Sequence, residues 1–117
     1  QQAFQEFQNQ DIYFDFDKYD LRTDARATLD RKASFLNQNS SVRVQIEGHC
    51  DERGTEEYNL ALGERRANAA KQYLTTAGIS AGRLSTISYG KERPLDPGHN
   101  EAAWAKNRRD HFVITGQ

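Results

Sequence analysis

Apolar and polar residues alternate in four short stretches of the chain, which is the pattern of β-strands with one buried face. The positions that share the apolar face are Ile12, Phe14 and Phe16 in the first stretch, and Val42, Val44 and Ile46 in the second. Residues 84–89 and 110–115 repeat the pattern. We therefore expect four strands, and the alternation predicts a sheet with one covered face and one wetter face.

Two longer segments have the three-and-four spacing of amphipathic helices. We expect one helix over residues 23–37 with Thr23 as its N-cap, and a second that begins after Thr55. The second helix is predicted to end at Gly78, which is followed by the apolar residue Ile79. A short third helix is expected over residues 102–108. The apolar seam of the second helix is narrow and contains small side chains: Leu60, Gly63, Ala67, Ala70, Leu74 and Ala77.

The order strand, helix, strand, helix, strand, short helix, strand predicts an α/β (α+β) two-layer sandwich. We expect a mixed four-stranded sheet with the helices on one face. Residues 11–117 would form this single domain. Residues 1–10, which are half glutamine, would form a flexible lead-in or tether, with Phe4 and Phe7 as possible docking points.

Composition excludes several classes of function. The chain has sixteen basic and seventeen acidic residues, so it lacks the excess of positive charge that binds nucleic acid. No apolar stretch reaches the roughly 20 residues of a membrane span. The chain begins with Gln1 and contains no methionine, so we expect a processed or trimmed fragment. Its single cysteine excludes an intrachain disulfide.

The triplet His49, Cys50 and Asp51 raises the question of catalysis or metal binding. Consecutive residues of an extended segment point to opposite faces, so Cys50 would point away from the other two. A metal site needs three or four ligands, whereas His49 and Asp51 offer two. We therefore predict no enzymatic activity, no metal and no cofactor, and interpret His49 as a packed residue at a strand end.

A different group of residues favours ligand binding. Asn59, Leu62 and Arg66 form one stripe on the second helix, and Asp51 lies just before that helix. This stripe is rotated around the helix from the apolar seam. It would therefore lie at the edge where the helix meets the loop, partly sheltered by protein and partly open to water. An anion and a cation held there suit a zwitterionic amino-acid group. In the alternative interpretation, Asp51 and Arg66 simply pair with each other and fix the loop to the helix, and spacing alone favours neither.

The segment GHCDERGTEEYNLALGERRANAAKQYL closely resembles the signature of OmpA-like peptidoglycan-binding domains, and YFDFDKYDL, ISYGKERP and EAAWAKNRR extend the resemblance over residues 12–109. The resemblance implies the fold of that family and non-covalent binding of the peptidoglycan stem peptide, chiefly its diaminopimelate residue. It implies that Asp51 holds the amino group of that residue and Arg66 its carboxylate. Further implied contacts are Phe16, Asp17, Asn59 and Leu62.

Lipid-anchored members of the family are the most similar to this chain. They are held at the inner leaflet of the outer membrane, on its periplasmic side, by an N-terminal cysteine that this chain lacks. They also bind TolB of the Tol system through a surface that overlaps the peptidoglycan site. The resemblance therefore implies a tether between the outer membrane and the cell wall. The alternatives are a domain of a larger porin or flagellar stator protein and, outside the family, a hydrolase of the wall peptide.

The chain departs from the family pattern at Cys50, where members usually carry Thr or Ala. We expect this cysteine to pack in the interior and not to react. The loop LDPGHNE and the tail DHFVITGQ also differ from the usual pattern, and these segments bear on the TolB surface more than on peptidoglycan binding.

Overall fold

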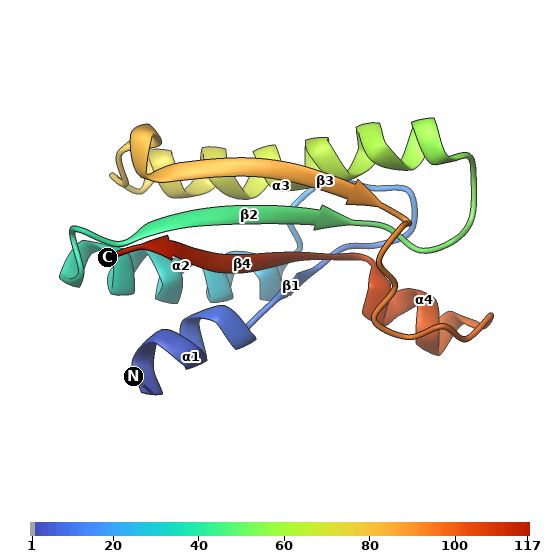
Figure 1. The fold of residues 1–117 in the computed structure, drawn as a ribbon, viewed down its shortest axis with the longest axis horizontal. Helices are drawn as coiled ribbons and strands as arrows, with labels where there is room; N and C mark the ends of the chain where they lie inside the picture. Colours follow the sequence, from blue (N-terminus) through green and yellow to red (C-terminus); the bar gives the residue numbers. More distant parts are fainter. Residues whose placement is uncertain (1) are drawn as a thin grey trace.

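A four-stranded mixed sheet forms the centre of the protein, and its strands run along the long axis of the molecule (Figure 1). The computed structural model describes residues 2–117. The strands are β1 (Ile12–Tyr13), β2 (Arg43–His49), β3 (Leu84–Gly90) and β4 (Arg109–Gly116), in the order β1-β4-β2-β3. β2 pairs parallel with β3 and antiparallel with β4, which also pairs antiparallel with β1. The predicted mixed sheet is confirmed.

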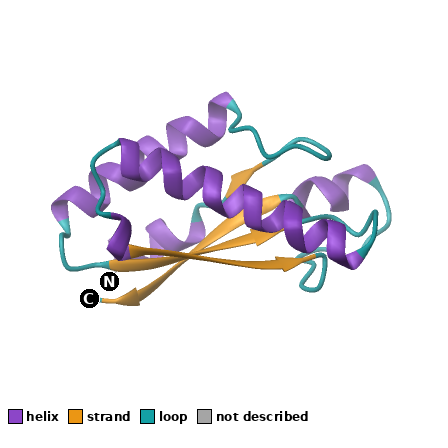
Figure 2. Ribbon diagram, turned by 90° about the horizontal axis from the view of Figure 1, so that it is seen from above, coloured by secondary structure: helices purple, strands orange, loops and turns teal. Residues whose placement is uncertain are grey.

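The helices are α1 (Gln2–Asn9), α2 (Thr23–Gln38), α3 (Glu56–Thr76) and α4 (Glu101–Asn107), with a 3-10 turn, η1 (Ala81–Arg83). The long helices α2 and α3 cover the same face of the sheet, as predicted (Figure 2). α4 lies beyond the end of β2, whereas α1 and the C-terminus lie at the opposite end of the sheet (Figure 1). Within residues 2–117, no helix is long and apolar enough to cross a membrane.

The core fills the space between the covered face of the sheet and the helices. Val44, Ile46 and Phe112 supply the sheet side, and each is at most 1% exposed. The helices contribute Ala25, Leu29, Ala33, Leu36, Ala67, Ala70 and Leu74. Each large apolar side chain buried in this way contributes roughly 1.5–3 kcal/mol to the free energy of unfolding, and these contacts fix the position of α3 on the sheet.

α3 begins and ends where the sequence predicts. The hydroxyl oxygen of Thr55 accepts a hydrogen bond from the backbone N–H of Tyr58 at 3.1 Å, so Thr55 is the N-cap. At the other end Gly78 has a φ of 103°, and the N–H of Ile79 donates to the carbonyl oxygen of Leu74. This is the predicted glycine stop.

The small residues of the seam let α3 touch the sheet through its backbone. A Cβ atom added at Gly48 would lie 1.8 Å from the carbonyl oxygen of Gly63. Leu60, however, is 37% exposed, so its assignment to the seam was wrong. Its backbone lies against Gly90, the last residue of β3, where the sheet ends. Ala77, the C-cap, is also exposed.

The N-terminal residues differ from the expected flexible lead-in. Residues 2–9 form α1, and Phe7 is 5% exposed in the core. The Phe7 ring stacks on Phe35 of α2 at 4.8 Å between centroids. The buried ammonium of Lys32 donates to the carbonyl oxygen of Phe7. These tertiary contacts hold α1 against the rest of the fold.

The first strand is shorter than predicted. β1 ends at Tyr13, and the chain then makes a turn in which the N–H of Lys18 donates to the carbonyl oxygen of Asp15 at 3.2 Å. The turn directs Phe16 outward, so it is 53% exposed and not a core residue. The cap assignment at Thr23 was also wrong: Thr23 is the first helical residue, and the N-cap is Arg22, whose guanidinium pairs with Asp24.

Candidate functional site

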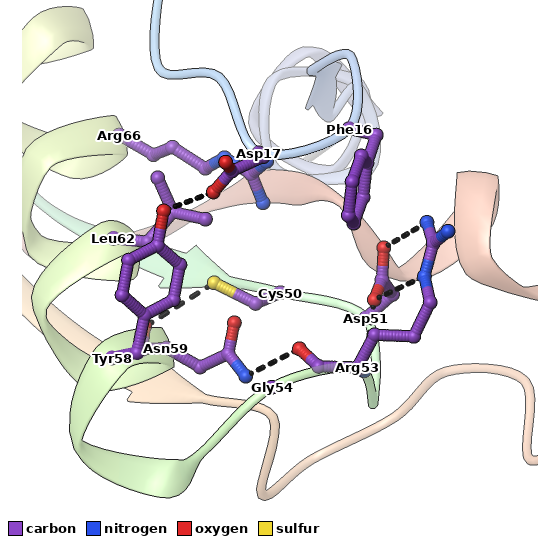
Figure 3. Close-up of a pocket in the computed structure, with 10 residues that line it drawn as sticks. All are labelled: Phe16, Asp17, Cys50, Asp51, Arg53, Gly54, Tyr58, Asn59, Leu62 and Arg66. Carbon is purple, nitrogen blue, oxygen red and sulfur yellow. Dashed lines mark hydrogen bonds and ion pairs between the residues drawn. The ribbon is translucent and has the colours of Figure 1, made fainter.

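A pocket of about 180 Å³ lies where β2 ends and α3 begins (Figure 3). The six residues predicted as the site come together here although they come from separate segments. The lining consists of Phe16, Asp17, Cys50, Asp51, Arg53, Gly54, Tyr58, Asn59, Leu62 and Arg66. The turn after β1 supplies one wall, the loop after β2 another, and the first turns of α3 the third (Figure 3).

Asp51 is 4% exposed and follows β2 in the loop that leads to α3. Its carboxylate accepts from the side chain of Arg53 at 3.1 and 2.9 Å, and from the backbone N–H of the same residue at 3.0 Å. Burial of Asp51 opposes ionisation, but these bonds and the charges of Arg53 and Arg108 outweigh it, so the pKa of the carboxyl lies below its ordinary value. Asp51 is therefore an anion at neutral pH.

Arg66 is completely buried, which differs from the expected half-sheltered rim. Its guanidinium donates to the carbonyl oxygens of Lys18 at 2.8 Å, His49 at 3.0 Å and Asp15 at 3.1 Å. Burial lowers the pKa of the guanidinium, but arginine keeps its charge in proteins. The structure thus gives Asp51 and Arg66 other partners than each other, so the direct pair considered as a structural alternative does not describe this site.

Asp17 and Phe16 stand in the turn after β1. Asp17 has a φ of 58°, an uncommon conformation for a residue with a side chain. Its carboxylate accepts a hydrogen bond from the hydroxyl of Tyr58 on α3, which closes one side of the pocket (Figure 3). The ring of Phe16 lies 3.9 Å from the guanidinium carbon of Arg53.

Asn59, Leu62 and Cys50 form the inner part of the pocket. The amide nitrogen of Asn59 donates to the carbonyl oxygens of Arg53 and Thr55 at 2.9 and 3.0 Å, so this side chain holds the loop against the helix. Leu62 is 4% exposed and supplies apolar surface. The thiol of Cys50 donates to the carbonyl oxygen of Asn59 at 3.2 Å, and burial raises its pKa to about 11. It is packed, as the sequence predicts.

The neighbouring histidine does not face this cysteine. His49 lies on the other face of the sheet, where its Nε2 is 3.0 Å from Glu47 and its ring is 5.5 Å from that of Tyr89. The part of the chain that the structure describes contains no group of three or more His, Cys, Asp or Glu residues arranged to hold a metal ion.

Sequence reasoning missed the parts of the pocket made by Arg53, Gly54 and Tyr58. A signal existed for Tyr58, which precedes Leu62 by one helical turn and so shares its face. Gly54 has a φ of 97°, and a glycine in a loop just before a helix cap can indicate such a positive φ. The position of Arg53 depends on contacts with distant segments and has no local signature.

The comparisons with known proteins agree with this fold. Residues 13–108 match the model of the OmpA family. The chain belongs to the OmpA family.

Within that family, it is similar to proteins named peptidoglycan-associated lipoprotein. It is 53% identical over 98 residues to the one from Pasteurella multocida, covering 84% of this chain and 65% of the relative. The identity is 54% over 98 residues with the one from Pseudomonas aeruginosa, covering 84% of this chain and 58% of the relative. The chain thus spans 58 to 65% of the length of these two relatives.

Solved structures show the same architecture. The peptidoglycan-associated lipoprotein from Burkholderia pseudomallei superposes with a TM-score of 0.88 at 41% identity, covering 92% of this chain and 91% of that one. The C-terminal domain of Helicobacter pylori MotB gives a TM-score of 0.84 at 20% identity, covering 92% and 85%, and this likeness concerns the fold alone.

Proposed function

We propose that this pocket binds the peptide stem of peptidoglycan without a covalent bond, and that it recognises the diaminopimelate residue of the stem. The observation that carries the proposal is the joint presence of an acidic and a basic side chain, Asp51 and Arg66, in the lining of one small pocket. The names of the relatives support peptidoglycan as the ligand. The free end of diaminopimelate bears an ammonium and a carboxylate on one carbon.

The carboxylate of the ligand would bind Arg66. A guanidinium has five N–H groups, and the three hydrogen bonds to carbonyl oxygens use three of them. The remaining two match the two oxygens of a carboxylate. Because the backbone carbonyls already fix the guanidinium, little side-chain freedom is lost on binding.

The ammonium of the ligand would bind Asp51, which is ionised at neutral pH for the reasons given above. Asp17 provides a second acidic group in the lining, and Leu62 provides apolar surface for the methylene chain. A charged hydrogen bond of this kind is worth roughly 1.5–3 kcal/mol, or about tenfold to a hundredfold in affinity.

We infer a tethering role from this binding. The relatives are named as lipoproteins associated with peptidoglycan, which supports a lipid-anchored protein on the periplasmic side of the outer membrane that holds the cell wall. TolB would be a second partner. If its surface overlaps the pocket, saturating stem peptide will reduce TolB binding in a pull-down, and unchanged binding would argue for separate surfaces.

The test of ligand identity is a calorimetric titration with a stem peptide that contains diaminopimelate and with one that contains lysine at that position. Lysine lacks the second carboxylate, so Arg66 would lose its partner and the affinity would fall by about tenfold or more. Equal affinities for the two peptides would exclude the proposed mode of binding.

The contribution of Asp51 is tested by Asp51→Asn, with Asp20→Asn as control. Asp20 is exposed and does not line the pocket. The first variant should lose about tenfold or more in affinity for the diaminopimelate peptide, while the control keeps the affinity of the unmodified chain. Co-sedimentation with isolated sacculi gives the same comparison on the intact wall. A comparable loss of affinity in both variants would indicate that the overall charge of the protein, and not this pocket, determines binding.

A further inference from the structure

The acceptor positions of Asp51 are already occupied by groups of the protein itself. Nε and Nη2 of Arg53 donate to its two carboxylate oxygens at 3.1 and 2.9 Å (Figure 3). The backbone N–H of Arg53 adds a third bond at 3.0 Å, and Nη1 of Arg108 lies 3.5 Å from Oδ2. A carboxylate has about four acceptor sites in all. An incoming ammonium must therefore displace one of these donors or share an oxygen with it.

The guanidinium of Arg53 is held in this position from both sides. Its central carbon lies 3.9 Å from the ring of Phe16 and 4.0 Å from the ring of Trp104. The indole N–H of Trp104 donates to Glu52 at 2.8 Å, which fixes that ring in turn. Arginine stacked on aromatic faces is stabilised by the attraction between the cation and the ring. This pair is thus more constrained than an ordinary surface ion pair.

Arg53 is nevertheless able to leave. Its side chain is 32% exposed, whereas that of Asp51 is 5% exposed. Phe16, which covers one side of the guanidinium, is itself 53% exposed and stands in a turn. Of the two members of the pair, the cation is the more exposed to water.

We propose that Arg53 is a specificity-determining residue that competes, as an internal cation, with the ammonium of the ligand for Asp51. This inference rests on the proposed function, because it assumes that the ammonium binds at Asp51. Binding would exchange one cation for another: the guanidinium moves off one or both side-chain bonds while the ammonium takes its place. The affinity for ligands with an ammonium is then lower than the pocket alone could provide, whereas ligands without an ammonium leave the pair closed and bind equally well with or without the competitor.

Removing the competitor should therefore strengthen binding. Without the Arg53 guanidinium, the buried carboxylate of Asp51 keeps only the backbone N–H and the distant Arg108, and a buried charge with too few partners is costly. A ligand ammonium would relieve this cost. The gain should be confined to ligands that carry the free amino group.

The experiment compares the intact chain, Arg53→Gln and Arg93→Gln by calorimetry. Arg93 is a matched control, because its guanidinium also stacks on an aromatic ring, that of Tyr89 at 3.7 Å, but it does not line the pocket. The ligands are the diaminopimelate stem peptide and the same peptide acetylated on the free amino group of that residue. We expect Arg53→Gln to bind the free-amino peptide about tenfold more tightly, the acetylated peptide within twofold, and Arg93→Gln to match the intact chain.

Two further variants keep the test decisive. Arg53→Lys retains the charge with fewer donors and should give an intermediate affinity. Adding Asp51→Asn to Arg53→Gln should cancel the gain, and thermal unfolding of each variant establishes that it is folded at the titration temperature. An unchanged affinity of folded Arg53→Gln for the free-amino peptide would show that Arg53 does not compete, and a weakened affinity would show that it assists binding. Either result would overturn the inference while leaving peptide binding intact.

Failure of the proposed function has a different signature. If the intact chain binds the free-amino and acetylated peptides equally, and Arg53→Gln does the same, the ammonium does not bind at Asp51 and the competition is overturned. If neither the intact chain nor Arg53→Gln binds either peptide, the proposed function falls and this inference falls with it.

Discussion

Nε of Arg66 on α3 lies 2.8 Å from the carbonyl oxygen of Lys18, a residue 48 positions earlier in the chain. Together with the bonds to Asp15 and His49, this contact joins the turn after β1, the end of β2 and α3 at a single side chain. A residue at the centre of the pocket is thus also a structural support. The two roles have to be separated in any experiment that substitutes it.

Arg66→Ala should lower the free energy of unfolding by about 3–5 kcal/mol, because three carbonyl oxygens lose their donor, a buried charge is removed from its partners and a cavity remains. Arg65→Ala is the control, since Arg65 is exposed and should change stability by no more than about 0.5 kcal/mol. Urea unfolding measures both. Similar stabilities would show that the three bonds contribute little, and only then would lost ligand binding in Arg66→Ala report on the pocket directly.

Gly48→Ala should prevent stable folding or cost more than about 3 kcal/mol, because the new methyl group would overlap the backbone of α3. Gly82→Ala provides the comparison, since its nearest contact would be 3.9 Å away at the hydroxyl of Ser80. Yield of soluble protein and thermal unfolding report the difference. A well-folded Gly48→Ala variant would mean that α3 can move away from β2 at little cost.

Lys32 should make stability depend on pH. Burial lowers its pKa from 10.5 to about 7. Above about pH 7 the folded protein releases this proton while the unfolded chain keeps it up to about pH 10.5, so the free energy of unfolding should rise with pH over this range, by at most about 1.4 kcal/mol per pH unit. Below about pH 7 both states are protonated and the contribution is constant.

The measurement compares urea unfolding of the intact chain and of Lys32→Met from pH 6 to pH 10. Both chains contain Cys50, so the contribution of its raised thiol pKa cancels in the difference. The difference in free energy of unfolding should shift in favour of the intact chain as pH rises. A constant difference across the range would indicate that Lys32 titrates as an ordinary lysine.

Cys50 should react slowly with thiol reagents in the native protein. Burial raises its pKa from 9.0 to about 11, which lowers the thiolate fraction at pH 8 by about a hundredfold, and restricted access lowers the rate further. Labelling in urea should proceed at the rate of an ordinary thiol. Rapid labelling of the folded protein, or sustained release of muropeptides from sacculi, would favour the hydrolase considered as an alternative.

Much of the fold could be predicted because the signals are local. The alternation along β2, β3 and β4 and the cap and stop of α3 each depend on residues within a few positions of one another. α1 was missed because it is stabilised by Phe35 and Lys32, which lie far away in the sequence. The outward direction of Phe16 was missed for a related reason, since a turn at Asp17 interrupts the alternation.

The six predicted residues all line the pocket, but three other lining residues and the bonding were not predicted. Helical spacing and the family resemblance brought Asp51 and Arg66 to one place, and both line the pocket. Their partners could not be foreseen. The groups that hold Arg66 are backbone carbonyls, which carry no sequence signature, and the position of Arg53 requires Phe16 and Trp104 to meet in space.

The arrangement of α1 and the pocket at opposite ends of the sheet has a mechanical consequence. The molecule is 40 Å long and 25 Å wide, and β2 and β4 run along its length (Figure 1). If the proposed membrane anchor lies on the N-terminal side of α1 and the wall peptide is bound in the pocket, tension would act along the strands. Their hydrogen bonds would then be loaded in shear and would resist the force together. α1 would be loaded first, because it is the element nearest to that attachment. Its release from Phe35, Phe112 and Lys32 would lengthen the tether while the pocket still holds the wall.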